Sequence, residues 1–287
     1  MPSTKPTNPK LLNPKPTNTK MTLYLIGTGL NTNSLTLEAL NAIKNSDKIY
    51  LETYTVDFPY PKTDLENEIN TFLKSDTYKL TPLSRENVEN ESLLQEAKTK
   101  NVSLLIYGDC LSATTHMQLI ISAKQQNIPI KIIQNTSIMT AVAQTGLSLY
   151  KFGKTTSMPN WQEHTNHPTS FINYIQQNQS IQAHTLILTD IGLTTPEAIK
   201  QLQKAATQKR LTLPEKIIII SNAGTPNQQV FHDTPNNLSK KNINLPFCII
   251  IPSDLSHTEV EALQTISEQN PSPPTSKSSI ILKSKKL

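Results

Sequence analysis

The sequence VSLLIYGDCLSATTH at residues 102–116 decides the fold. Its first part, 102–107, is almost continuously apolar, which predicts a strand buried on both faces of a sheet. Gly108 then allows the backbone to turn off the strand, and Asp109 places a carboxylate at the strand's carboxyl end. A helix is predicted to follow at 113–126. Because open α/β sheets bind ligands beyond the carboxyl ends of their strands, this turn predicts one wall of a binding crevice.

The same strand–turn–helix order occurs on either side of this stretch. Residues 22–26 predict a strand, which Gly27-Thr28-Gly29 separates from a helix at 35–45. Residues 130–133 predict another strand, followed by Gln134-Asn135-Thr136-Ser137 and a helix at 138–150. The other elements predicted in this half are a strand at 48–51 that ends at Glu52 and polar helices near 64–75 and 86–99.

The pattern restarts after the connector KTTSMP. The helix at 196–208 is predicted to begin at Thr195-Pro196, a cap residue followed by proline. A last helix is predicted to begin at Ser256, which forms a capping box with Glu259. The remaining predicted elements are a helix at 169–178 and strands at 184–189, 216–220 and 247–251.

Strands that alternate with helices in both halves predict an α/β protein of two units joined near 154–162. The predicted domains are 21–155 and 156–268. The two ends of the chain, 1–20 and 269–287, contain no acidic residue and four lysines each, and they are predicted to be disordered arms. Only 7 glycines occur in 287 residues, so those that follow strands are expected to have a conformational or ligand-binding role.

Charge and cysteine content exclude several classes of protein. The chain has 27 basic and 22 acidic residues, but eight lysines lie in the arms, which leaves 19 basic residues in the body. A slightly acidic body disfavours nucleic acid as the main partner. Cys110 and Cys248 are predicted to be small buried residues in a reducing compartment. The N-terminus has no apolar core of a secretory signal, and no apolar run is long enough to cross a bilayer, so the chain is expected to be soluble and cytoplasmic.

Several residues have more than one interpretation when only the sequence is considered. Gly27-Thr28-Gly29 with Glu52 suits a dinucleotide site, another ligand turn or a purely structural turn. Asp109 is suited either to binding a cationic group or to stabilising its own loop. The amides of Ser137 and Ile138 are candidates to receive ligand oxygens, and a simple helix cap explains them equally. His116 is a weak candidate for a catalytic base and is more typical of a packed histidine; no second ligand at metal spacing accompanies it, so no metal site is predicted.

Together these segments resemble the diphthine synthases, S-adenosylmethionine (SAM)-dependent methyltransferases of the tetrapyrrole-methylase (class III) fold. The resemblance runs through MTLYLIGTGL (21–30), GDCLSATTH (108–116) and NTSIMTAVAQTGLSLYKFGKT (135–155). It implies two α/β domains with SAM in the cleft between them, and a homodimer. The SAM contacts that it implies are Leu30, Asp109, Ser112, Ser137, Ile138, Leu188, Ala223 and Cys248.

The resemblance also implies a substrate. This is the amino group of a 3-amino-3-carboxypropyl-modified histidine on translation elongation factor 2, on the route to diphthamide. The chain departs from the family pattern at Cys110, Asn222 and Cys248, where Pro, Arg and His are usual. The alternatives are another class III methyltransferase that acts on a corrin ring or ribosomal RNA, and a SAM-binding module without activity.

Overall fold

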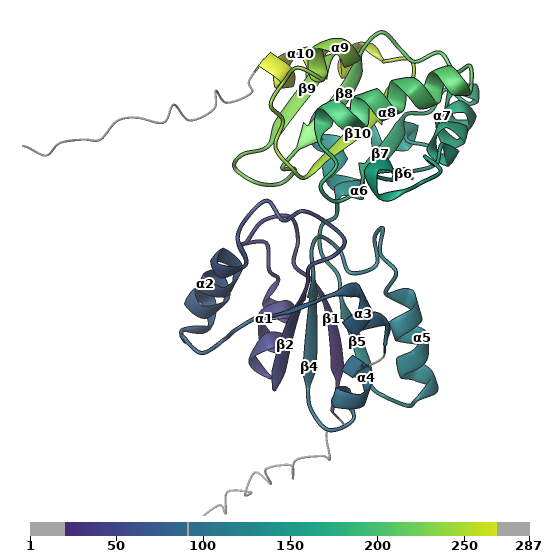
Figure 1. The fold of residues 1–287 in the computed structure, drawn as a ribbon. Helices are drawn as coiled ribbons and strands as arrows, with labels where there is room; N and C mark the ends of the chain where they lie inside the picture. The colour runs from purple at the N-terminus through teal and green to yellow at the C-terminus, as the bar shows by residue number, and fades with distance from the viewer. Residues whose placement is uncertain (1–20, 91, 269–287) are drawn as a thin grey trace, which may run out of the picture.

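The computed structural model describes residues 21–90 and 92–268, which contain two five-stranded sheets with helices packed on them (Figure 1). The predicted arms, 1–20 and 269–287, lie outside the described residues. The α/β class predicted from the alternating pattern is confirmed. The division into domains at residue 155 stays a prediction.

The first sheet is entirely parallel, with strand order β3-β2-β4-β1-β5. Its central strand β4 has every residue buried, as its apolar sequence predicted. The sequence predicted the strands of this sheet except the three-residue edge strand β3. The strands are β1 (Leu23–Gly27), β2 (Lys48–Glu52), β3 (Thr81–Leu83), β4 (Val102–Ile106) and β5 (Ile130–Ile133).

The helices of the first half differ from the prediction where tertiary contacts intervene. The predicted helix at 113–126 begins four residues later, because Ala113 has a left-handed conformation with φ of 58°. The predicted helix at 86–99 is two short helices. These helices are α1 (Leu37–Lys44), α2 (Lys62–Leu73), α3 (Arg85–Glu89), α4 (Ser92–Ala97) and α5 (Met117–Gln125).

The connection between the sheets is not the single helix predicted at 138–150. The α-helix α6 (Ile138–Ala141) continues as a 3₁₀-helix over Val142–Thr145, and a second 3₁₀-helix covers Leu149–Lys151. Gly146 separates them with a left-handed φ of 86°. A Cβ atom on Gly146 would lie 2.4 Å from the Cβ of Ala262, so the close approach of the last helix requires glycine here.

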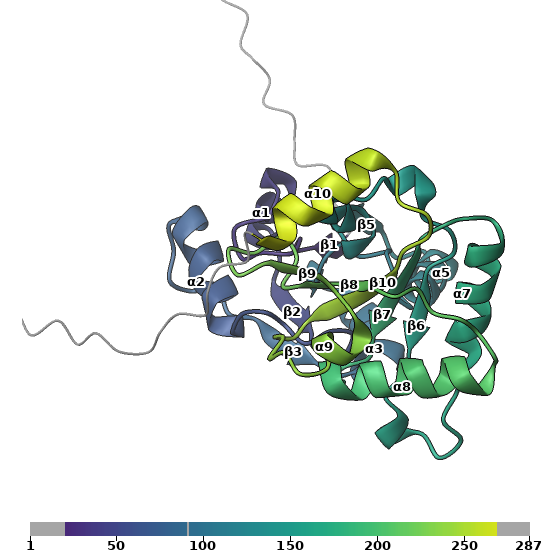
Figure 2. The ribbon, with the colours of Figure 1, turned by 90° about the horizontal axis from the view of Figure 1, so that it is seen from above.

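The second sheet is mixed, with order β6-β7-β10-β8-β9. Its strand β10 is antiparallel to both neighbours, β7 and β8. The four consecutive isoleucines of β8 are buried on both faces: Ile217 and Ile219 pack with α8, and Ile218 and Ile220 pack on the side of α10 (Figure 2). The strands are β6 (Thr156–Met158), β7 (Thr185–Thr189), β8 (Ile217–Ser221), β9 (Gln229–Asp233) and β10 (Phe247–Ile251).

The three long helices of the second half follow the predicted pattern, with one correction. The strands β6 and β9 and the short helices at Trp161–Glu163 and Pro235–Leu238 were not predicted. The N-cap of α8 is Thr194 and not Thr195: its hydroxyl and amide bond the Glu197 carboxylate in a capping box. The predicted capping box of the last helix is present, since Ser256 and Glu259 exchange hydrogen bonds. The helices are a 3₁₀-helix at Trp161–Glu163, α7 (Ser170–Ser180), α8 (Thr195–Gln208), α9 (Pro235–Leu238) and α10 (His257–Glu268).

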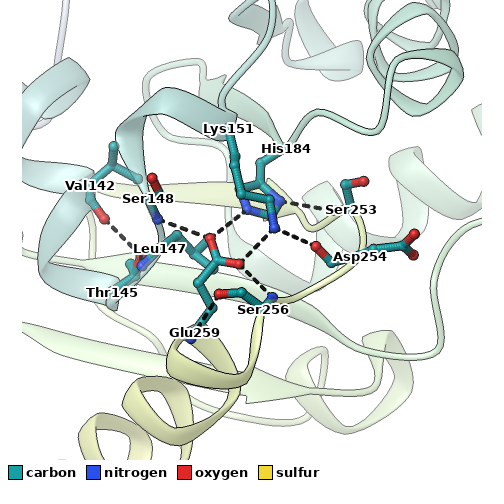
Figure 3. A network of polar contacts seen from close by, with 10 residues as sticks. All are labelled: Val142, Thr145, Leu147, Ser148, Lys151, His184, Ser253, Asp254, Ser256 and Glu259. Atoms are coloured by element: carbon teal, nitrogen blue, oxygen red, sulfur yellow. Dashed lines mark hydrogen bonds and ion pairs between the residues drawn. The ribbon is translucent and has the colours of Figure 1, made fainter.

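A buried polar network joins the connection between the sheets to the second sheet (Figure 3). The Glu259 carboxylate lies 2.7 Å from Nζ of Lys151 and 3.1 Å from Nε2 of His184, and it also accepts the N–H groups of Ser148 and Ser256. The Ser253 N–H donates to Nδ1 of His184. His184 is therefore the neutral tautomer with its proton on Nε2.

This network makes the stability of the fold sensitive to acid. Burial lowers the pKa of His184 from 6.5, and the Lys151 ammonium, the Ser148 and Ser256 amides and His184 hold the pKa of Glu259 well below 4.5. Both groups bind fewer protons in the folded protein than in the unfolded protein. We therefore expect the free energy of unfolding to decrease as pH falls below about 6.5, and to decrease further below about 4.5. Thermal unfolding at pH 7, 5.5 and 4 measures this. A His184→Gln variant should be less stable at pH 7 and lose less on acidification; an equal loss in both chains would contradict the assignment.

Candidate active site between the two sheets

A pocket lies between the two halves of the chain and is lined by residues that are far apart in the sequence. It measures about 880 Å³ with its open mouth, within the usual ~300–1,000 Å³ of small-molecule sites. All of the residues that the family resemblance implied as SAM contacts line it: Leu30, Asp109, Ser112, Ser137, Ile138, Leu188, Ala223 and Cys248.

The topology of both sheets explains why these residues meet. The lining residues of the first half follow β1, β2, β4 and β5, whose carboxyl ends lie at one edge because the strands are parallel. In the second half, Leu188 lies near the end of β7 and Ala223 follows β8, whereas Cys248 lies near the start of β10. Since β10 runs antiparallel to β7 and β8, its start lies beside their ends.

Glycines allow the first two loops to touch. Gly29 and Gly108 exchange backbone hydrogen bonds of 3.0 Å in both directions, and both have a left-handed φ of 73°. A Cβ atom on Gly27 would lie 2.7 Å from the carbonyl oxygen of Gly108. The turn after β1 is therefore paired with the turn after β4, and this pairing places Leu30 and Asp109 on the same pocket wall.

Asp109 holds the pocket wall together. Its Oδ1 accepts hydrogen bonds from the Leu111 N–H (2.9 Å) and the Ser112 hydroxyl (3.0 Å), and its Oδ2 accepts the Asn135 N–H (3.1 Å). The side chain of Asn135 in turn donates to the carbonyl of Gly27. The interpretation of Asp109 as a residue that stabilises its own loop thus applies, and its bond to Asn135 extends this role to the loop after β5.

Ser137 is the N-cap of α6, because its hydroxyl accepts the N–H of Met139. The simple helix cap that the sequence left open is present, on the wall of the pocket. On the opposite side, Gly224 lies against Leu30: a Cβ atom there would be 2.8 Å from the Cβ of Leu30. Leu30 also belongs to the same apolar cluster as Ala223, so the two halves are in contact at the pocket floor.

The charged side chains that line the pocket are all acidic. Its charged lining side chains are Asp57, Asp109 and Asp190, and among the described residues no lysine, arginine or histidine lines it. Burial raises the pKa of Tyr107 well above its usual range and that of Cys248 to about 12, so both are neutral at physiological pH. The pocket therefore favours a cationic ligand over an anionic one.

His116 does not line this pocket. It is 1% exposed, and its Nε2 lies 3.4 Å from the buried carboxylate of Glu52. Burial lowers the pKa of His116 to about 4 and raises that of Glu52. His116 is therefore a buried, neutral histidine that packs in the protein interior and does not reach the pocket.

The dinucleotide interpretation requires Glu52 at the end of the strand beside β1. In this sheet β4 lies between β1 and β2, and Glu52 is 1% exposed, with its Oε1 bonded to the Thr55 hydroxyl. A buried carboxylate on a strand that does not adjoin β1 is not placed to bind a ribose. The structure therefore disfavours a dinucleotide site.

Two loops that complete the pocket were not predicted from the sequence. Residues 55–57 after β2, the last residue of β7 (Thr189) and residues 190–191 after it line the pocket. The Asp57 carboxylate accepts the Gly192 N–H across the two halves at 2.8 Å. Residues 54–63 are rich in Pro and Tyr, a composition that indicates a loop but no ligand contact. In the part of the chain that the structure describes, no group of three or more His, Cys, Asp or Glu side chains is arranged to hold a metal ion. Within the same part, no helix combines the length and apolarity needed to span a membrane.

Comparisons with known proteins agree with this site. A model of the tetrapyrrole (corrin/porphyrin) methylases matches residues 22–238. A diphthine synthase of Methanocaldococcus jannaschii is 34% identical over 86% of this chain and 99% of its own length. The chain belongs to the diphthine synthase family of tetrapyrrole methylases.

Two other matches support the same family. A diphthine methyl ester synthase of Dictyostelium discoideum is 33% identical to this chain, over 85% of this chain and 98% of its own length. A crystal structure of a diphthine synthase superposes with a TM-score of 0.75 at 28% identity and covers 86% of this chain and 96% of that one. As a member of the diphthine synthase family, the chain is a methyltransferase.

Proposed function

We propose that this chain transfers methyl groups from SAM to the amino group of a 3-amino-3-carboxypropyl-modified histidine on translation elongation factor 2, a step of diphthamide biosynthesis. One observation carries the proposal. The residues that the resemblance to diphthine synthases implies as SAM contacts line one pocket, and the charged side chains of that pocket are all carboxylates. The names of the relatives support the substrate. The corrin and ribosomal RNA alternatives lack such relatives among these matches.

The pocket residues fit SAM in charge and polarity. SAM is a sulfonium cation with an α-amino group, which suits carboxylates, and Leu30, Ile138 and Leu188 supply apolar walls. The residues that would hold SAM are Leu30, Asp109, Ser112, Ser137, Ile138, Leu188, Ala223 and Cys248. When bound, it supplies a methyl carbon that a neutral amine attacks.

The chain's own residues then act by positioning. Asp109 fixes two loops against each other through its three hydrogen bonds, which preorganises the wall before the ligand binds. The half-buried walls exclude water from the reacting groups. Tyr107 and Cys248 are neutral and do not serve as bases at physiological pH. We therefore assign no protein base, and the proton of the substrate amine leaves to water.

Calorimetry and mass spectrometry test the proposal. Titration with SAM should give saturable binding, whereas NAD, with its anionic pyrophosphate, should not bind the acidic pocket. Modified elongation factor 2 should gain the mass of one CH₂ for each methyl group transferred. If SAM does not bind, the pocket must bind a different ligand and the proposal is wrong. If SAM binds but the substrate gains no mass, the proposed substrate is rejected and an inactive binding module is favoured.

A second candidate reaction is methylation of the substrate carboxylate, because the relative from Dictyostelium discoideum is named a diphthine methyl ester synthase. Esters are hydrolysed by mild base and methylated amines are not. In the same mass-spectrometry experiment, a methyl group that is lost in mild base reports ester formation, and one that persists reports N-methylation.

We further propose that the chain is a homodimer that acts in the cytoplasm. Met117 and Ile121, one helical turn apart on α5, are 53% and 41% exposed. Apolar side chains at this spacing lie on the same face of a helix and support an interface there.

A further inference from the structure

The pocket extends beyond the residues that would hold the methyl donor. Its additional lining comes largely from loops at 55–57, 113–114 and 189–191, which belong to both halves of the chain. A nucleophile that attacks a methyl group must approach from the side opposite the departing sulfur, so the substrate amine needs space that the donor leaves free. This additional lining includes two carboxylates, Asp57 and Asp190.

The three pocket aspartates differ in how many of their oxygens are already engaged. Asp109 uses both oxygens within the loops it fixes. Asp190 also uses both: Oδ1 accepts the Ile191 N–H at 3.1 Å and Oδ2 accepts the Asn160 N–H at 3.2 Å. Asp57 differs, because Oδ2 accepts the Gly192 N–H, while Oδ1 has no hydrogen bond to any residue of 21–90 and 92–268.

Hydrogen bonds on both sides of Asp57 hold its loop in place. The buried Glu52 carboxylate accepts the Thr55 hydroxyl at 2.6 Å and the Tyr54 N–H at 3.3 Å. The bond from Gly192 anchors the other end of the loop to the second half of the chain. The Asp57 carboxylate is thus fixed at one oxygen and available at the other.

We propose that Asp57 binds the amino group of the substrate through its free carboxylate oxygen; this inference rests on the proposed N-methylation. During transfer the nitrogen lone pair forms the N–C bond while the C–S electron pair goes to sulfur, so positive charge moves from sulfur to nitrogen. A carboxylate beside the nitrogen stabilises that developing charge. The ammonium then releases its proton to water, which restores a neutral amine for a further transfer.

The matched variants Asp57→Asn and Asp57→Ala separate charge from anchoring. Asparagine keeps an oxygen that can accept the Gly192 N–H but removes the charge, and alanine removes both. We expect both variants to lose about 100-fold or more in kcat/KM for modified elongation factor 2, by analogy with the removal of other groups that stabilise developing charge. Asp57→Glu should recover part of the loss. The affinity for SAM should stay within about threefold, and Asp76→Asn, an exposed acid outside the pocket, should be unchanged in both measurements.

Each outcome decides the inference. If Asp57→Asn transfers methyl groups as fast as the wild type while Asp57→Ala is impaired, only the anchoring bond matters and the inference is wrong. A loss of SAM affinity equal to the loss of turnover would also overturn it, since Asp57 would then act on the donor. A wild-type chain that transfers no methyl group would overturn the proposed function, and this inference with it.

Discussion

Asp109→Ala should weaken SAM binding on the order of 100-fold or more. The variant removes three hydrogen bonds that a 7% exposed carboxylate accepts from Leu111, Ser112 and Asn135. Hydrogen bonds to charged groups contribute ~1.5–3 kcal/mol each, and ~1.4 kcal/mol is a tenfold change in affinity. Without them the loop after β4 separates from the loop after β5, and two walls of the pocket lose their relative position. Isothermal titration with SAM measures the effect.

Two further variants identify the cause of this loss. Asp109→Asn keeps one acceptor oxygen but turns an amide N–H toward a backbone N–H, so its affinity should lie between those of the wild type and the alanine variant. Asp76→Ala, an exposed acid remote from the pocket lining, should bind SAM as the wild type does. An Asp109→Ala chain that is folded and binds SAM within threefold of the wild type would show that the loops keep their positions without this carboxylate.

Glu259→Ala should be the most destabilising of the substitutions considered. The side chain is 3% exposed and pairs with both Lys151 and His184, while it accepts two backbone N–H groups (Figure 3). Removing one partner of a buried ion pair leaves the other charge and the amides uncompensated, which costs ~3–5 kcal/mol. For a chain of this length we expect the melting temperature to fall by about 10 °C. Differential scanning calorimetry measures it.

The neighbouring Glu261 provides the matched control, because it lies on the same helix and is exposed. Glu261→Ala should change the melting temperature by less than about 2 °C, since exposed charges contribute little. Glu259→Gln keeps one acceptor oxygen for the Ser148 or the Ser256 amide and turns an N–H toward the other, so its melting temperature should fall between the two. If Glu259→Ala melts within 2 °C of the wild type, the network does not hold the connection to the second sheet.

Much of the site was predictable because it depends on local sequence. Gly108 and Asp109 follow an apolar strand, and the carboxyl ends of parallel strands share one edge of a sheet, so the turns after 26, 107 and 133 had to lie together. The family resemblance then indicated the second wall, at Leu188, Ala223 and Cys248, and the structure brings these residues to the same pocket.

Other features depend on pairs of residues that no local pattern connects. Asp57 and Gly192 are 135 positions apart, and Lys151 and Glu259 are 108 apart. The position of β4 between β1 and β2 is also a property of the whole sheet, and it removed the dinucleotide interpretation of Glu52. The start of α5 at Met117 follows from the loop that Asp109 stabilises and not from helix propensity.

By itself the sequence determined the α/β class, the strands of the parallel sheet except its short edge, and the turns in which glycine and a carboxylate follow a strand. It did so because apolar runs, glycines and helix caps act over a few residues. Only the tertiary structure decided which carboxylates remain available to a ligand, since that depends on the backbone N–H groups that packing brings to them. Asp109 and Asp190 accept backbone N–H groups at both carboxylate oxygens, and Asp57 accepts one at a single oxygen.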